Sequence, residues 1–438
     1  MTPISGKMSK RPGQTIKERF ASIGKPYFAF LRMDTCILAI VALLSIFINS
    51  FILRAADGAG NGVDTALIYN MVTYGSQPFF MVFAVLVVRK VSPGHSQRIG
   101  FLFFALLFLF IIITGEKAAT DYFIVPALLR SAGAGFYYVT YSFQIIEYTT
   151  DENRDAASGI SGTISSVIAL LFPFLAGLFL SSFEGSFTGY RIFFGFLLGI
   201  TLLAFIFSLK LTPLSKVIDK CDKKTHLAGA FKGLMKEKAG RSILLMTFFK
   251  GVRSGAMAFF IELLIFNAIK DEAIVGLNST TGKIAAIVGA ILYGFIVTPR
   301  RRAKSVAVAS SLIIAAAVVL FFRADWIFLI IFSVFNSGLN IFITDPELTL
   351  YFTVIDSIGE LKGKAGEVHT VNEVFLASGE VIGIGLTLAA NLLFPGNSIA
   401  ATAAVILLTG SQFFCAGLIS KITKALASDS SSSPSSEA

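Results

Sequence analysis

The sequence has 438 residues, of which 55% are hydrophobic and 15% charged, and its mean hydropathy is +0.76. Soluble globular proteins carry about 25% charged residues, so this composition excludes an ordinary soluble domain. The formal net charge of +10 does not indicate a nucleic-acid partner, because the basic residues follow a topological pattern along the chain.

Apolar runs long enough to cross a bilayer follow one another from 34 to 421. A spanning helix needs about 20 mostly apolar residues. Only helices and closed barrels satisfy their backbone groups in lipid, and these runs lack the alternation of barrel strands. We therefore predict an all-α polytopic membrane protein with 12 transmembrane helices, at 34–54, 65–88, 99–115, 122–147, 157–181, 190–210, 242–268, 276–297, 306–322, 326–352, 369–394 and 398–421.

Most of the 37 Lys and Arg residues fall in both termini and in alternate connections between the spans. By the positive-inside rule, this bias predicts that the N- and C-termini are cytosolic. The longest connection is rich in lysine, and within it 228–240 is expected to form a short amphipathic surface helix. The predicted domains are a cytosolic segment at 1–33, a six-helix bundle at 34–210, a cytosolic loop at 211–241, a second six-helix bundle at 242–421 and a disordered Ser-rich tail at 422–438.

The cysteines and histidines are too scattered for a disulfide framework, a metal cluster or a catalytic motif. No nucleotide-binding motif accompanies the glycine-rich stretches. We expect no cofactor, no metal and no catalytic residue. Gly379, Gly383 and Gly385 are instead expected to allow close approach of helices.

Arg130 is followed by Gly133 and Gly135 in the fourth span, and Pro173 by Gly177 in the fifth. These two local motifs, with the six-plus-six layout, resemble the major facilitator superfamily of secondary transporters. The stretches 147–155 and 372–380 resemble a bacterial branch of that family, while the basic clusters after spans 2 and 8 lack the acidic residue of the family's loop signature. The resemblance implies two bundles that alternate access to a central cavity lined by spans 1, 4, 7 and 10.

Ionisable side chains inside spans are costly, about 2.5–3.5 kcal/mol each on insertion scales, so their positions indicate function or a paired structural role. Arg253 and Glu380 lie near the middle of their spans by residue count. In the functional interpretation Arg253 holds an anionic group and Glu380 carries a coupling proton. In the structural interpretation both belong to satisfied networks that hold the bundle together.

The full set of candidates follows from polar residues within spans and charges at their ends. The substrate or coupling candidates are Arg130, Tyr137, Tyr141, Gln144, Lys250, Arg253, Asn336, Asn340 and Glu380. The gating candidates are Glu147, Arg154, Arg300, Glu367 and Glu373. Packing between helices and solvated charge are the alternatives for these two sets.

These features predict a secondary active transporter, coupled to protons, in a bacterial plasma membrane. Its partners would be a small-molecule substrate, the proton and the lipid bilayer. The basic candidates favour an anionic or zwitterionic solute, and the many phenylalanines are compatible with an amphiphile. The alternatives are a channel, a non-transporting sensor on the same scaffold or a membrane-embedded enzyme.

Overall fold

The computed structural model describes residues 23–56, 61–90, 93–149, 154–183, 186–211, 227–322, 326–358, 365–394 and 398–432. Nearly all of these residues are helical. The long helices of the first half are α2 (Lys25–Ala56), α3 (Gly62–Lys90), α4 (Pro93–Thr114), α6 (Ile124–Tyr148), α7 (Arg154–Ser181) and α8 (Phe187–Leu209). Those of the second half are α11 (Lys238–Ile269), α12 (Glu272–Ile296), α13 (Arg302–Phe322), α14 (Trp326–Ser357), α15 (Ala365–Leu393) and α16 (Ser398–Ser432). The shorter elements are α5 (Lys117–Thr120), α10 (Leu227–Lys236) and the 3-10 helix η2 (Pro299–Arg301).

Within the described residues, 10 helices are long and apolar enough to cross a membrane. The other two long helices are α6, which contains Arg130, and α11, which contains Lys250 and Arg253. The predicted all-α class with 12 membrane helices is confirmed. The side of the membrane on which the termini lie stays a prediction.

The observed helix limits differ from the predicted domain limits at both ends of the chain. Helix α2 begins at Lys25, before the predicted start at 34, and α16 continues to Ser432, beyond the predicted end at 421. Within the predicted central loop, α10 forms where an amphipathic helix was expected, and it packs on α11 and α15. The remaining domain limits stay predictions.

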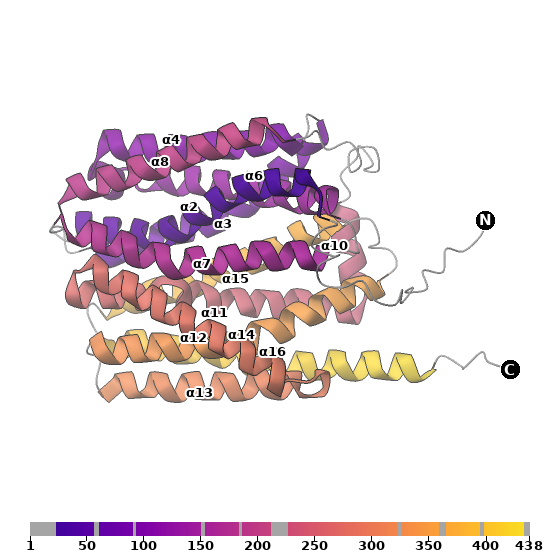
Figure 1. The fold of residues 1–438 in the computed structure, drawn as a ribbon. Coiled ribbons are helices and arrows are strands. Elements are labelled where there is room, and N and C mark those ends of the chain that lie inside the picture. The colour runs from indigo at the N-terminus through magenta and orange to yellow at the C-terminus, as the bar shows by residue number, and fades with distance from the viewer. Residues whose placement is uncertain are drawn as a thin grey trace.

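The helices form two groups, one from each half of the chain (Figure 1). Across the boundary, α7 packs on α12, α3 on α15, and α2 contacts α11. Helix α2 begins and α16 ends at the same end of the molecule, where α10 also lies (Figure 1). We call this the termini end, and we call the opposite end, where α2, α7 and α15 finish, the far end.

Side-chain burial is reversed relative to a soluble protein on the outer faces of the helices. Phe295 is 85% and Phe322 86% exposed, as expected where the surrounding medium is hydrocarbon rather than water. Aromatic rings fill the interior of the first half, where the centroid of Phe51 lies 5.4 Å from those of Tyr190 and Phe194. Lipid therefore solvates the outer faces, and ring packing contributes to the contact between α2 and α8.

Polar contacts join the two halves at the far end. Arg54 at the end of α2 binds Glu272 at the start of α12 through Nε and Nη2, both at 2.8 Å, and Nη2 also donates to the carbonyl of Lys270 at 2.9 Å. The hydroxyl of Tyr190 donates to Glu272 at 2.8 Å. We call Arg54, Glu272 and Tyr190 the far-end latch, because together they tie three helices across the boundary.

Two further contacts reinforce this closure. Ser181 Oγ donates to Asp271 at 2.5 Å, and Asn391 Nδ2 donates to Asp64 at 2.7 Å. Asp271 also caps α12, because its carboxylate accepts the backbone N–H of Ala273 at 2.8 Å. One residue thus starts the helix and links it to α7 in the other half.

Candidate functional site

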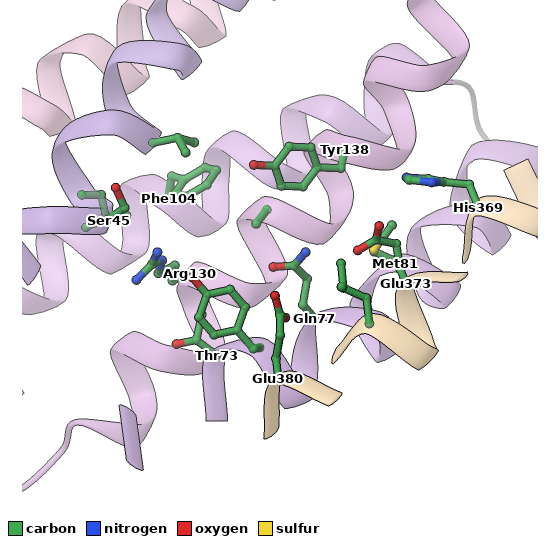
Figure 2. A pocket seen from close by; sticks show the side chains of 15 residues that line it. Ser45, Thr73, Gln77, Met81, Phe104, Arg130, Tyr138, His369, Glu373 and Glu380 are labelled. Atoms are coloured by element: carbon green, nitrogen blue, oxygen red, sulfur yellow. The ribbon is translucent and has the colours of Figure 1, made fainter. Parts of the chain in front are cut away.

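A cavity of about 430 Å³ lies between the halves. Its wall comes from α2, α3, α4 and α6 of the first half and from α15 of the second. The lining residues are Val41, Leu44, Ser45, Thr73, Tyr74, Gln77, Met81, Phe104, Arg130, Ala134, Tyr138, His369, Glu373, Leu376 and Glu380 (Figure 2). Volumes of about 300–1,000 Å³ are typical of small-molecule sites, so the cavity is large enough for a metabolite.

Arg130 of α6 is the basic end of this cavity. Its guanidinium carbon lies 5.9 Å from the centroid of the Tyr69 ring, a cation–π arrangement. Its Nη1 atom is shielded from solvent, and it has no hydrogen-bond partner in good geometry among the described residues. The phenol groups of Tyr69, Tyr74 and Tyr138 interact with it electrostatically, and that of Tyr69 also has a hydrogen-bond interaction with the guanidinium. An anion of a ligand would supply an acceptor for Nη1, which has none in the described structure.

Three ionisable residues of α15 supply the opposite side of the cavity. His369, Glu373 and Glu380 follow at intervals of four and seven, which places them along one face of the helix. Glu373 and Glu380 are about 10 Å apart along the axis at 1.5 Å per residue. Ser254 Oγ of α11 donates to Glu380 at 3.3 Å. Glu373 and Glu380 form what we call the acidic face of α15.

Arg253, Asn336 and Asn340, three of the predicted residues, meet in one cluster. Arg253 Nη1 donates to Asn340 at 2.8 Å and Nη2 donates to Asn336 at 3.1 Å. Arg253 is only 5% exposed and does not line the 430 Å³ cavity. Glu347 of α14, 2% exposed, acts on it electrostatically, and both Glu347 carboxylate oxygens lack a hydrogen-bond partner in the described structure. This cluster belongs to the interior of the second half.

Lys250 lies one turn before Arg253 on α11 and is half-buried. It interacts electrostatically with four carboxylates, those of Asp345, Glu347, Glu373 and Glu380. One ammonium group therefore faces several acids of α14 and α15. Lys250 and Arg253 carry like charges three residues apart on α11, and these acidic neighbours offset their repulsion.

The four substrate or coupling candidates of α6 have different surroundings in the structure. Arg130 lines the cavity, whereas Gln144 is fully buried and donates to Gln97 of α4 at 2.5 Å. Tyr141 packs on Phe30, with ring centroids 5.7 Å apart. Tyr137 is 3% exposed and donates to the carboxylate of Asp34. The cavity wall on α6 is instead Arg130, Ala134 and Tyr138, one position around the helix.

The gating candidates whose side chains the structure describes do not form one group. The side chains of Glu147 and Arg154 lie outside the described part of the structure. Arg300 is exposed in η2, and Glu367 is 5% exposed in the first turn of α15. Glu373 lines the cavity. Of this set, Glu373 alone is brought next to the substrate and coupling candidates Arg130 and Glu380 within the described structure.

Several cavity residues were missed from the sequence. Tyr74 and Gln77 are polar side chains within the second predicted span, beside Pro78, and this local polarity is the signal that could have found them. Asp34 is also notable, although it lies outside the cavity. It is fully buried and accepts hydrogen bonds from Tyr137 and, at 3.2 Å, from Ser161, so it joins α2, α6 and α7.

Comparisons with known sequences place this architecture in a family. A model described as Major Facilitator Superfamily matches residues 35–384. The protein YqgE of Bacillus subtilis (strain 168), which is described as uncharacterized, is 25% identical over 347 residues, covering 78% of this chain and 77% of the relative. A Geobacillus stearothermophilus protein, described as uncharacterized and from the sodM 3' region, is 28% identical over 146 residues, or 33% of this chain and 66% of the relative.

Solved structures with the same fold are transporters. A D-xylose-proton symporter superposes with a TM-score of 0.70 at 10% identity, covering 90% of this chain and 97% of that one. The nucleoside transporter NupG gives 0.65 at 12% identity and covers 90% of this chain and 99% of its own. The E. coli fucose:proton symporter FucP gives 0.59 at 14% identity, with coverage of 90% and 99%. The chain is a multi-pass integral membrane protein, and it belongs to the Major Facilitator Superfamily.

Proposed function

We propose that the protein is a secondary active transporter, not an enzyme, that carries a small solute across a bacterial plasma membrane in exchange for, or together with, protons. The observation that carries this proposal is a cavity walled by both halves of the chain, with a cation from one half and carboxylates from the other. Transporters of this architecture bind their solute between two bundles that rock around it. Sugar, nucleoside and fucose transporters with the same fold support a small-molecule substrate.

The distribution of contacts between the halves supports alternating access. The far-end latch and the Ser181–Asp271 and Asn391–Asp64 hydrogen bonds hold the halves together at one end. The cavity extends from mid-bundle toward the termini end, since its lining includes His369 in the second turn of α15. With the predicted cytosolic termini, this conformation faces the cytosol.

Glu380 is the residue we propose for proton coupling. Its carboxylate faces the cavity, is half-buried and accepts one hydrogen bond, from Ser254. Such a group takes up a proton when the cavity is dry and releases it when water enters, because burial in low dielectric disfavours the charged form. The cycle would thereby link the cavity's exposure to one side of the membrane with protonation.

The test is uptake into proteoliposomes of a panel of labelled anionic, zwitterionic and amphiphilic solutes, followed by counterflow with the solute that enters. We expect counterflow without any imposed gradient, because exchange requires alternating access. Uptake that equilibrates without counterflow would instead indicate a channel. Accumulation driven by a pH gradient should disappear when a protonophore is added, and accumulation that survives the protonophore would contradict proton coupling.

The Glu380→Gln variant isolates the coupling residue. It should lose accumulation driven by the pH gradient yet keep counterflow, because counterflow needs no change in protonation. The exposed Glu237 provides the matched control, and Glu237→Gln should behave like the unaltered protein. If Glu380→Gln shows normal accumulation driven by the pH gradient, Glu380 is not the proton-coupling residue.

A further inference from the structure

We propose that the solute is a zwitterion whose anionic group binds Arg130 and whose cationic group binds the acidic face of α15. This inference rests on the proposed function and names the class of substrate for the same cavity. Arg130 comes from the first half of the chain and Glu373 and Glu380 from the second, and all three line one cavity of about 430 Å³.

The first argument is that the opposite charges of the cavity do not neutralise each other. Among the described residues, Arg130, Glu373 and Glu380 form no ion pair within 4 Å, and Nη1 of Arg130 is shielded from solvent without a hydrogen-bond partner. A buried charge without a partner is costly. A ligand that carries both charges would satisfy both ends at once, whereas a simple anion would leave the acidic face unpaired.

The second argument concerns the countercharges already present. On the acidic side, His369 of the cavity lining acts on Glu373 alone. Lys250 acts on both Glu373 and Glu380, and its single charge is shared with Asp345 and Glu347 as well. It does not line the cavity. The acidic face therefore keeps a net negative potential toward the cavity, which favours an ammonium group of the ligand.

The third argument is the space between the charged ends. In Figure 2, Arg130 lies at one end of the labelled group and His369 and Glu373 at the other, with Gln77 and Glu380 between them. The rings of Tyr74, Phe104 and Tyr138 also line this space. Aromatic faces attract ammonium groups and pack against apolar atoms, so the interval suits a ligand with an apolar segment between its two charges.

A ligand of this kind would also connect the two halves. Its carboxylate or other anionic end would contact α6, and its ammonium end would contact α15. The same acidic face binds the proton in the proposed function, so ammonium and proton compete for it. Occupancy by the zwitterion would therefore hold the halves in one arrangement while displacing the proton from Glu380.

The experiment uses ω-amino acids of increasing chain length as probes of charge separation, from glycine to 8-aminooctanoate. Alkanoates and alkylammonium ions of the same lengths are the singly charged controls. Each probe is added to the purified full-length protein in detergent, and the midpoint of thermal unfolding is measured. Ligands that bind only the folded state raise this midpoint.

We expect ω-amino acids of an intermediate length to raise the midpoint by about 2 °C or more, well above either singly charged series. Arg130→Gln should weaken binding of the best probe by about tenfold or more, to the affinity of the alkylammonium ion of the same length, because it removes a charge-assisted hydrogen bond. The double variant Glu373→Gln/Glu380→Gln removes the acidic face. In this variant the best probe should bind only as tightly as the alkanoate of the same length. The exposed residues Arg241 and Glu237 supply matched controls, and Arg241→Gln and Glu237→Gln should leave the length profile unchanged.

Equal shifts with alkanoates, or with alkylammonium ions, at every length would overturn the zwitterion inference. So would the absence of a shift with every ω-amino acid. Counterflow separates this outcome from failure of the proposed function. A length-dependent shift without counterflow would support the binding site and contradict the transport function. Counterflow of a singly charged solute alone would support transport and contradict the zwitterion inference.

Discussion

Arg130 and Arg253 are both guanidinium groups of the bundle interior, but their surroundings differ. Arg253 gives two hydrogen bonds to the amides of Asn336 and Asn340, so its charge is held within the second half. Arg130 has a buried nitrogen without such a partner and faces the cavity. From this difference we propose a structural role for Arg253 and a ligand-binding role for Arg130.

Replacement of Arg253 tests this difference. We expect Arg253→Gln to lower the free energy of unfolding by about 1–3 kcal/mol, because it removes both charge-assisted donors from two part-buried amide oxygens. Lys250→Gln is the control, since Lys250 gives no hydrogen bond in the described structure and should cost less. Thermal unfolding in detergent measures both. Unchanged stability of Arg253→Gln together with lost ligand shifts would restore the substrate role predicted from the sequence.

Gly379 and Gly385 of α15 also differ in what surrounds them. A Cβ atom at Gly379 would strike the carbonyl oxygen of Phe248 on α11, whereas one at Gly385 would meet open space. The predicted close approach is therefore observed at Gly379 and not at Gly385. We expect Gly379→Ala to destabilise the protein by about 1–3 kcal/mol and Gly385→Ala to be neutral or slightly stabilising. Equal unfolding midpoints for the two variants would contradict this packing.

At the scale of elements, the sequence was sufficient to predict the spans but not how each helix is rotated. Long apolar runs identify helices because lipid leaves the backbone few alternatives. The face that a helix turns to the cavity depends on its tilt and its neighbours. On α6, the spacing of Arg130, Tyr137 and Tyr141 places them on nearly one helical face, yet Tyr138 lines the cavity and Tyr137 contacts Asp34.

Helix boundaries had a similar effect. The first span was predicted to begin at 34, which puts Asp34 at its end. The helix starts at Lys25, and Asp34 is an interior residue with no exposed area. The cluster of Arg253, Asn336 and Asn340 could be predicted residue by residue, but its assembly required knowledge that α11 and α14 are neighbours.

The far-end latch gives a prediction about helix movement. Glu272→Gln removes the carboxylate that binds Arg54 and Tyr190, so the far end should open more often. Spin labels at the exposed positions Glu116 and Phe394, in a background with Cys221→Ser, would report the distance between the halves by pulsed electron paramagnetic resonance. We expect a new population at longer distance. Asp121→Asn, at another exposed acid of the far end, is the control, and an unaltered distance distribution in Glu272→Gln would contradict the latch.

For the molecule as a whole, the two-bundle arrangement was predicted from the count of apolar runs and the lysine-rich stretch that divides them. The pairing of α3 with α15 and of α7 with α12 was not, because contacts between distant helices leave no periodic signal in one sequence. The cavity is a property of that pairing. Its acids come from α15, a helix that the family resemblance did not predict to line it.

The α7–α12 crossing has a consequence for chemical control of the transport cycle. A methyl group at Gly177 would collide with the carbonyl oxygen of Glu272, and one at Gly276 with that of Pro173. These two glycines belong to different bundles, so a single added methyl group would force the two bundles apart at this contact. Gly177→Ala should therefore shift the population toward a conformation in which α7 and α12 lie further apart at this crossing. Inhibitor screens and crystallisation trials could then use this less populated conformation.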